Sequence, residues 1–351
     1  MSFDRDARIE AMLSIARRLR DARDPLGIAA RERLFASACL SREGLELALS
    51  EHLETQASSA ERARMCAWAG EAPRCHVVLS ANVVTGAFRA ILLGLLSAPV
   101  VFVKPSRRQP ELAQMIVGEL APVLKDGAIS LVDTLSPGAL DVVHGYGSDT
   151  TMAAIARALP EGVRFRGHGS GFGVALIDEA ADIDAAADAL ARDVVVFDQR
   201  GCLSPRVALV LGAPARGLAF ARALHGALAR FSRLVPVGER DNQNEVSAFA
   251  QIMLAIGDVF QERDHLVAFE AEPTAMSLPP AARVVSVLSC TDLSAATSLM
   301  APFCSWITSL GVASAEPLET FDALRPRGAR LASVGSMQRP PLDGPVDERG
   351  R

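Results

Sequence analysis

The sequence predicts an α/β protein with two α/β domains behind a helical N-terminal region. The chain has 351 residues, which is more than a single hydrophobic core usually serves. Half of the residues are hydrophobic and only 5% are aromatic, so the core must consist mainly of Ala, Leu and Val. From Arg74 onward, short Val-rich runs alternate with longer helical segments, which indicates βα units and a mainly parallel sheet.

The N-terminal region, residues 1–72, has apolar positions at helical spacing and no strand-like alternation. We expect three or four helices there, packed on the domain that follows. Residues 73–193 are expected to form that first α/β domain. Its predicted strands are 76–80, 99–103, 128–132, 141–145, 163–166 and 173–177. Its predicted helices are 86–97, 109–123, 149–159 and 182–193.

The alternation begins again after Cys202, so residues 194–334 are expected to form a second α/β domain. Its predicted strands are 206–211, 265–270, 283–289, 306–312 and 329–333. Its predicted helices are 215–231, 243–260 and 292–301. The tail, residues 335–351, is rich in Pro and charge and has no periodicity, which predicts an extended arm or a disordered segment.

Charge and composition argue against several classes of protein. The net charge is −5 and no long basic run is present, so we expect no nucleic-acid partner. The apolar window Ala90–Val103 is too short for a membrane span and contains Pro99, which favours a buried helix followed by a buried strand. The N-terminus lacks the layout of a signal peptide, and the six cysteines form no CxxC pair or metal-like spacing with the histidines. We therefore expect a cytoplasmic protein without a metal site.

Cys202 lies in the stretch VVVFDQRGCLSPRVALV (Val194–Val210), between a polar turn and an apolar run that is typical of a strand. Gly201 precedes it and Leu-Ser-Pro follows it, so the thiol is expected at a turn, where backbone N–H groups can point at a developing oxyanion. A cysteine at a turn is a candidate nucleophile, and a small buried hydrophobic residue is the alternative interpretation.

Three other polar segments follow predicted strands. Lys104 ends an apolar run and is followed by Pro105 and Ser106. Gly147 and Ser148 form a turn between a strand and a helix, and Asn82 follows the first strand. The carboxyl ends of parallel strands meet at one edge of the sheet, where α/β proteins bind ligands, although solvated strand ends and ordinary turns have the same appearance.

The order and separation of these segments resemble the aldehyde dehydrogenase superfamily. The acyl-CoA reductase branch, which includes the LuxC-type fatty acyl reductases, is the most similar. The resemblance is close at FDQRGCLSPR, where family members carry an Asp-Gln doublet before the nucleophile, and at GSMQRPP (Gly335–Pro341), which is similar to a C-terminal signature of that branch. It covers roughly residues 74–342. It implies an aldehyde dehydrogenase-like fold, with a Rossmann-like cofactor domain over 73–193 and a catalytic domain over 194–334.

The resemblance also implies roles for individual residues. Cys202 matches the catalytic nucleophile, and Asn82 matches the amide that forms the oxyanion hole with the Cys202 N–H. Lys104 matches the lysine that reaches the adenosine ribose, with Ser106 in the same cofactor-binding segment. Gly147 and Ser148 match the turn beneath the cofactor pyrophosphate.

Two departures from the family pattern bear on the chemistry. Hydrolytic relatives have a glutamate that activates the deacylating water, whereas the aligned segment here is GHGSGFG, with His168 or Gly167 at that position. Without that base, water should attack an acyl-enzyme slowly, which suits an acyl group carried as a thioester. His168 is expected to act as an acid–base or as a thioester contact, and a turn residue is the alternative.

The second departure concerns the choice of cofactor. NAD-preferring relatives place a glutamate three residues after the lysine, whereas this chain has Arg107, followed by Arg108. Guanidinium groups pair with phosphate through two hydrogen bonds, so the change favours the 2′-phosphate of NADPH over NADH, which is kept as the alternative.

The resemblance implies an NADPH-dependent reductase that converts an acyl thioester, carried by CoA or by a carrier-protein phosphopantetheine, to an aldehyde through an acyl-enzyme on Cys202. Two alternatives stay open. One is a semialdehyde dehydrogenase or acyl-phosphate reductase of the same superfamily, and the other is a shortened, non-catalytic member that acts as a binding partner. The resemblance makes a homodimer the expected assembly.

Overall fold

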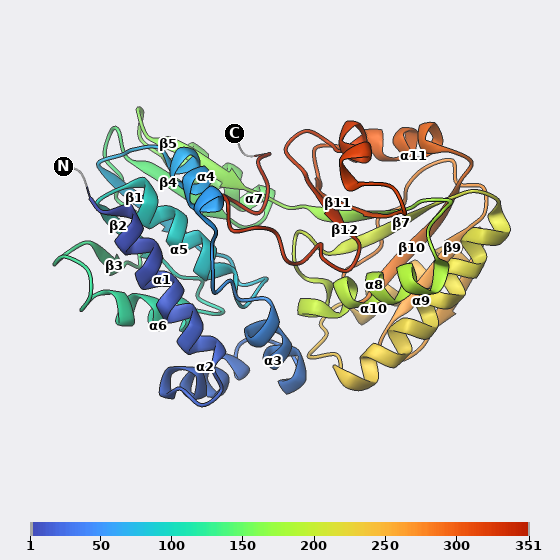
Figure 1. Ribbon diagram of the computed structural model, residues 1–351, viewed down its shortest axis with the longest axis horizontal. Coiled ribbons are helices and arrows are strands. Elements are labelled where there is room, and N and C mark those ends of the chain that lie inside the picture. Colours follow the sequence, from blue (N-terminus) through green and yellow to red (C-terminus); the bar gives the residue numbers. More distant parts are fainter. Residues whose placement is uncertain (1–2, 350–351) are drawn as a thin grey trace. The chain divides into compact units, whose positions relative to one another are not determined.

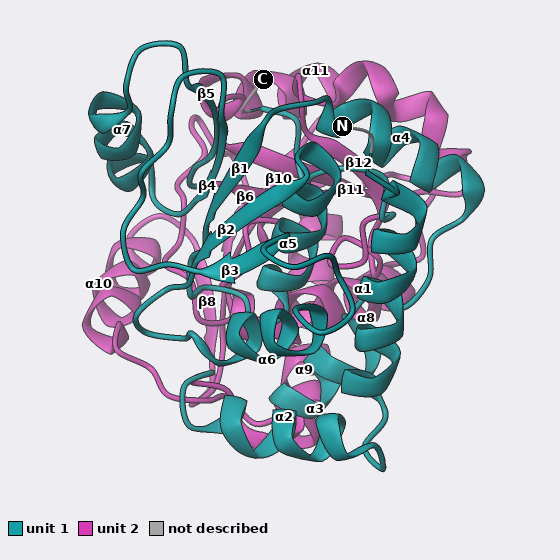
Figure 2. Cartoon of the chain, turned by 90° about the vertical axis from the view of Figure 1, so that its left-hand side faces the viewer, with its two compact units in different colours: residues 1–38, 45–170, 341–351 teal, residues 39–44, 171–340 magenta. Residues whose placement is uncertain are grey.

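The computed structural model describes residues 3–349, which form two compact units. Unit 1 contains residues 1–38, 45–170 and 341–351, and unit 2 contains residues 39–44 and 171–340, as Figure 2 colours them. The expected boundary between the α/β domains at 193/194 therefore lies inside unit 2. The reason is that the strand over Phe172–Ile177 pairs with strands of unit 2.

Unit 1 is built on a five-stranded parallel sheet with the order β3-β2-β1-β4-β5 (Figure 1). The strands are β1 (Arg74–Val78), β2 (Val100–Lys104), β3 (Ile129–Leu131), β4 (Val142–Tyr146) and β5 (Arg164–His168). Helices α5 (Gly86–Ser97), α6 (Glu111–Leu120) and α7 (Asp149–Ala158) connect them. Helix α5 is buried almost throughout, and β2 follows it directly, as predicted for the apolar window.

Four helices precede this sheet, in agreement with the expected three or four. They are α1 (Arg5–Arg20), α2 (Pro25–Phe35), α3 (Arg42–Glu51) and α4 (Ser59–Ala69). Helices α1 and α4 pack on α5, and α1 and α2 pack on α6, so the N-terminal region does cover the sheet's helices. Local signals explain where the helices begin: the Asp4 side chain caps α1, and Ser58 and Glu61 form a capping box at α4.

The last described residues, 341–349, have no regular secondary structure but pack on unit 1. Arg89 of α5 donates hydrogen bonds from Nη1 to the carbonyls of Pro341 (2.9 Å) and Gly344 (3.0 Å). The Leu342 N–H donates to Glu61 Oε1 (3.2 Å), and the Leu342 side chain is buried. This part of the tail is therefore an extended arm, the first of the two alternatives.

Unit 2 is built on a seven-stranded sheet with the order β12-β11-β6-β7-β10-β9-β8, in which only the β8–β9 pair is antiparallel among the described strands. The strands are β6 (Phe172–Ile177), β7 (Pro205–Leu211), β8 (Asp258–Gln261), β9 (Leu266–Glu270), β10 (Val284–Cys290), β11 (Ile307–Ala313) and β12 (Arg330–Ser333). A mixed α/β fold with two mainly parallel sheets confirms the predicted fold class.

Helices cover both faces of this second sheet (Figure 1). Helices α8 (Ile183–Val195) and α9 (Pro214–Leu234) pack on one face through Ala175 and Ile177 of β6. Helix α11 (Leu293–Met300) packs on the other face through Val174 and Leu176. Successive residues of a strand point to opposite faces, so β6 is hydrophobic on both, as a buried parallel strand requires.

One predicted element is wrong at its end. The helix expected over 243–260 is α10 (Gln243–Leu254), and β8 follows it at Asp258. Between them, a Cβ at Gly257 would lie 1.9 Å from the Phe269 carbonyl oxygen, so the chain approaches β9 too closely for any larger residue.

Within the described residues, no helix is long and apolar enough to cross a membrane.

Candidate active site

The carboxyl edge of the unit 1 sheet gathers most of the residues predicted to bind a cofactor. Lys104 ends β2, and Gly147 and Ser148 follow β4. Asn82, the predicted oxyanion-hole residue, follows β1 by four residues. The strand order places β1 and β4 side by side, and the connections from these two strands run in opposite directions across the sheet. Such a switch point is where open parallel sheets bind ligands at their carboxyl edge.

Cations are concentrated at the end of β2. The Leu79 N–H donates to the Lys104 carbonyl (3.0 Å), which fixes the backbone of the lysine against the end of β1. Ser106 pairs with Gln109 in an isolated bridge, and its hydroxyl accepts from the Arg108 N–H (3.3 Å). Arg107 is exposed, and within residues 3–349 neither Lys104 nor Arg107 has an ion-pair partner. The arrangement leaves positive charge available for an anionic ligand.

The Gly147–Ser148 turn joins β4 to α7. The Gly147 N–H donates to the His168 carbonyl (3.1 Å), and the Ser148 hydroxyl caps α7 by accepting from the Thr151 N–H (3.2 Å). Asp149 accepts from the Ser170 N–H (2.8 Å) in the same turn. Ser148 therefore stabilises the start of α7, and a Cβ at Gly147 would lie only 3.3 Å from Met152 Cε.

His168 ends β5 inside unit 1. Its ring stacks on Tyr146 with a centroid distance of 4.8 Å and lies 6.3 Å from the Trp68 ring. The side chain is buried, and neither ring nitrogen has a hydrogen-bond partner among the described residues. Burial lowers the pKa of His168, against the opposing effect of the nearby Asp347 carboxylate, which indicates a neutral imidazole at pH 7.

Cys202 belongs to unit 2, where it is partly exposed in a turn just before the amino end of β7. The Ser204 N–H donates to the Gly201 carbonyl (3.0 Å), which closes the turn around Cys202. The buried Thr308 hydroxyl lies within hydrogen-bond distance of the Cys202 carbonyl and of the Phe172 carbonyl. The turn is thus fixed to both β6 and β11.

The segment Gly335–Gln338, the start of the GSMQRPP motif, contacts the same turn. Gln338 Nε2 donates to the hydroxyl of Ser204 (3.0 Å). The buried Asp193 carboxylate of α8 accepts from the Gly335 N–H (2.6 Å). Burial raises the pKa of Asp193 to about 7, although the N–H groups of Gly335, Met337 and Gln338 lower it. Sequence reasoning singled out this motif but neither its partner Asp193 nor Thr308, the partner of the Cys202 turn, because both residues carry no local signal of their own.

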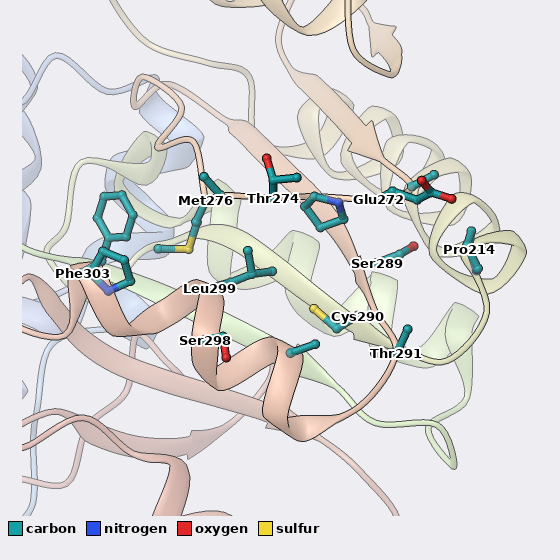
Figure 3. A pocket seen from close by; sticks show the side chains of 15 residues that line it. Pro214, Glu272, Thr274, Met276, Ser289, Cys290, Thr291, Ser298, Leu299 and Phe303 are labelled. Atoms are coloured by element: carbon teal, nitrogen blue, oxygen red, sulfur yellow. The ribbon is translucent and has the colours of Figure 1, made fainter.

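A separate hollow of about 920 Å³ lies in unit 2 beside α11. Figure 3 shows Phe303 at one end, Pro214 and Glu272 at the other, and Leu299 and Cys290 between them. Glu272 is the only charged residue among the fifteen described residues that line it. A wall without cations does not suit the phosphates of CoA or of a dinucleotide.

Solved structures define the class of protein to which this fold belongs. The chain is similar to an oxidoreductase from Marinobacter aquaeolei (12% identity, TM-score 0.70, 95% of this chain and 79% of that chain). It is also similar to a methylmalonate-semialdehyde dehydrogenase (DddC) from Oceanimonas doudoroffii (13%, 0.70, 97% and 79%) and to an NAD-dependent benzaldehyde dehydrogenase from Corynebacterium glutamicum (15%, 0.67, 96% and 83%). The fold is that of the aldehyde dehydrogenases.

The family is more specific than the fold. The family model described as acyl-CoA reductase (LuxC) matches residues 28–347. The chain therefore belongs to the acyl-CoA reductase (LuxC) family, as its motifs predicted. No curated protein matches it. Family and fold together support an oxidoreductase of the aldehyde-forming or aldehyde-oxidising kind.

Proposed function

We propose that this protein reduces an acyl thioester to an aldehyde with NADPH, through an acyl-enzyme on Cys202. The observation that carries the proposal is the turn around Cys202. It places the partly exposed residue Cys202 at the amino end of β7 and is held by Thr308 and Gln338, in a chain of the acyl-CoA reductase family. A structural cysteine would be expected inside the core, where Cys75 and Cys290 are fully or almost fully buried.

The first half-reaction is acyl transfer. The Cys202 thiolate attacks the thioester carbonyl, and the amide of Asn82 and the backbone N–H of Cys202 stabilise the oxyanion. A C–S bond forms to Cys202 as the C–S bond to the carrier breaks. The released thiolate, of CoA or of a phosphopantetheine arm, then takes a proton. Asn82 is exposed, and no described residue engages its side chain, so the amide is available to a ligand.

The second half-reaction is reduction. NADPH, when bound, would supply a hydride equivalent. With that hydride, the acyl group on Cys202 would become a thiohemiacetal alkoxide, whose oxyanion Asn82 and the Cys202 N–H would stabilise. Collapse of the alkoxide would break the C–S bond, release the aldehyde and return the Cys202 thiolate. The segment GHGSGFG has no glutamate to activate water. The lifetime of the acyl-enzyme against hydrolysis is therefore expected to be long.

The cofactor site is proposed at the carboxyl edge of the unit 1 sheet. Lys104 and Ser106 would contact the adenosine ribose, and Arg107 would pair with its 2′-phosphate, since its charge is exposed and unpaired among the described residues. Gly147 and Ser148 would lie beneath the pyrophosphate. The hydroxyl of Ser148 already caps α7, so the turn contributes its shape and backbone more than this side chain.

His168 is proposed to act as an acid–base or as a thioester contact. Its buried, neutral imidazole stacks on Tyr146 and lies 6.3 Å from the Trp68 ring. Replacing His168 with Gln separates the two roles. Loss of acid–base chemistry changes the pH dependence of kcat, whereas loss of a contact raises KM for the thioester alone.

The experiment is a direct assay. The protein is mixed with acyl-CoA esters of several lengths and NADPH, NADPH oxidation is followed, and the aldehyde is trapped. We expect turnover with the thioester that is lost in Cys202→Ser. Acyl phosphates replace the thioester in a parallel series, and preferential turnover of the phosphates would favour an acyl-phosphate reductase. Unchanged turnover in Cys202→Ser would refute the assigned nucleophile.

A further inference from the structure

The segment before Cys202 has an unusual backbone. Phe197, Asp198 and Gln199 have φ values of 54°, 50° and 62°, and none of the three is glycine. The left-handed conformation costs an ordinary residue roughly 1–2 kcal/mol. Three such residues in succession persist only where the surrounding contacts hold them. The segment ends three residues before the proposed nucleophile.

Asp198 is held by a buried ion pair. Its Oδ1 accepts from Arg283 Nε (3.0 Å) and from Arg283 Nη2 (2.6 Å), and both side chains are almost completely buried. Its Oδ2 accepts from the Gly238 N–H (2.9 Å). Arg283 in turn donates from Nη1 to the Ser232 hydroxyl (3.0 Å) and to the Val235 carbonyl (2.8 Å). Asp198 is therefore joined to the end of α9 and to the residue before β10.

Gln199 is bonded through both ends of its amide. Its Nε2 donates to the carbonyls of Pro205 (2.8 Å) and Val284 (2.8 Å), and its Oε1 accepts from the Val284 N–H (2.9 Å). The side chain is 1% exposed, so no water competes for these bonds. Both amide N–H donors and the oxygen are in use, which fixes the side chain in one orientation.

These contacts bracket Cys202. The Gln199–Pro205 hydrogen bond closes a short loop with Cys202 between its two ends. The Gln199–Val284 pair and the Asp198–Arg283 pair attach that loop to the start of β10, which is the neighbour of β7 in the sheet. The sheet thus sets the position of the thiol from both sides of the turn.

We propose that Asp198 and Gln199 are positioning residues for Cys202: they hold the left-handed segment so that the thiol and the Cys202 N–H face the thioester carbonyl together. This inference rests on the proposed function. Without the hydrogen bonds of Asp198 and Gln199, the left-handed segment relaxes toward right-handed conformations and the turn around Cys202 moves. Substrate contacts elsewhere are unchanged. A displacement of about 1 Å at a reacting group can cost about 100-fold in rate.

The test uses Gln199→Glu, which keeps the size of the side chain but replaces the two N–H donors with an oxygen facing two carbonyls. We expect kcat to fall at least about tenfold with KM changed less than about twofold. The rate of Cys202 alkylation by iodoacetamide should fall by a similar factor, whereas that of Cys304, which is exposed in the same unit, should be unchanged. The matched control is Gln243→Glu, at an exposed position on α10, which should change neither.

Asp198→Asn is the second variant, because it keeps an oxygen toward Arg283 while removing the charge. If Gln199→Glu does not fold, kcat, KM and the Cys202 alkylation rate are measured in Asp198→Asn, and the same changes are expected. A folded variant of either kind with wild-type kcat and a wild-type Cys202 alkylation rate would overturn the inference. The alkylation rate does not depend on turnover. It therefore tests the positioning role of Asp198 and Gln199 separately from the proposed function. Full activity of the Cys202→Ser variant would instead refute the proposed function.

Discussion

At the scale of single residues, the sequence offered candidates for the reactive side chains but not for the residues that hold them in place. Cys202 and Lys104 became candidates because each adjoins an apolar run that is typical of a strand, and Arg107 became one through the family resemblance. Thr308 and Asp193 did not become candidates, since a hydroxyl in a strand and a carboxylate in a helix are ordinary residues until the fold brings them to the Cys202 turn or to the GSMQRPP motif. Their role depends on contacts more than 100 residues away in the chain.

Reversing the charge of Arg107 tests the cofactor assignment. In Arg107→Glu, the carboxylate would repel a 2′-phosphate, so we expect kcat/KM for NADPH to fall at least about tenfold and the NADPH-to-NADH ratio to fall with it. Arg222→Glu on α9 makes the same change of net charge at an exposed position and should leave the ratio unchanged. An unchanged ratio in Arg107→Glu would contradict the assignment.

Asp193 should make stability depend on pH. Its folded pKa, about 7, is above its unfolded value, so the native state holds the proton more tightly than the unfolded chain does. The contribution of Asp193 to stability is therefore fully present below the unfolded pKa and is lost as the pH rises toward 7. Asp193→Asn should remove that loss. The difference in free energy of unfolding, variant minus wild type, should therefore rise by up to about 1.4 kcal/mol per pH unit between pH 4 and 7. The same pH dependence of the free energy of unfolding in the two proteins, measured by urea denaturation over that range, would contradict this prediction.

At the scale of elements, the alternation of strands and helices was predictable, but membership in a sheet was not. Strands β5 and β6 are separated by three residues, Gly169–Gly171, yet they belong to different sheets. Hydrophobic periodicity reports burial of a strand and not the identity of its neighbours. For the same reason the expected boundary at 193/194 misplaced β6 and α8.

Close packing between β11 and the Gly335–Gln338 segment predicts a coupled pair of substitutions. A Cβ at Gly311 would lie 2.4 Å from Met337 Sδ, and Met337 is 1% exposed, so Gly311→Ala should destabilise unit 2 by about 1–3 kcal/mol. The cost should be smaller in a Met337→Ala background, giving a coupling free energy of about 1 kcal/mol or more. Gly118→Ala on α6, where nothing lies within 4 Å, is the matched control and should be neutral or stabilising. Additive costs in the cycle would contradict the packing.

At the scale of the whole molecule, the two sheets, one parallel and one mainly parallel, carry the proposed reactive groups at different ends of their strands. The cofactor residues of unit 1 follow the carboxyl ends of strands, whereas Cys202 of unit 2 precedes the amino end of β7. Composition and βα alternation predicted two α/β domains, and the family motifs predicted their roles. The course of residues 341–349 over unit 1 could not be predicted, because the tail has no periodicity and its partner Arg89 lies about 250 residues earlier.

Arg89 should control that arm. It is buried, donates to the Pro341 and Gly344 carbonyls, and forms an ion pair with Glu54 (2.8 Å). Arg89→Met leaves these partners unsatisfied, so we expect a loss of about 3 kcal/mol and faster hydrogen exchange over residues 341–349. The control is Arg64→Met, which removes a more exposed contact to the same arm at Asp343 and should cost less than about 1 kcal/mol. Equal exchange rates in the two variants would contradict the account.

The homodimer expected from the family resemblance is a separate property of the whole molecule. Light scattering should give twice the chain mass of 37.1 kDa, and a mass of one chain across the concentration range would refute the dimer.

The central claim is that an acyl group passes from a thioester to Cys202 before reduction. The most direct measurement is intact-protein mass spectrometry after mixing the protein with acyl-CoA in the absence of NADPH. We predict one acyl adduct per chain, located on Cys202 by peptide mapping, absent in Cys202→Ser and discharged as aldehyde when NADPH is added. The contrary result is active protein with no adduct at Cys202, or the same adduct and aldehyde in Cys202→Ser.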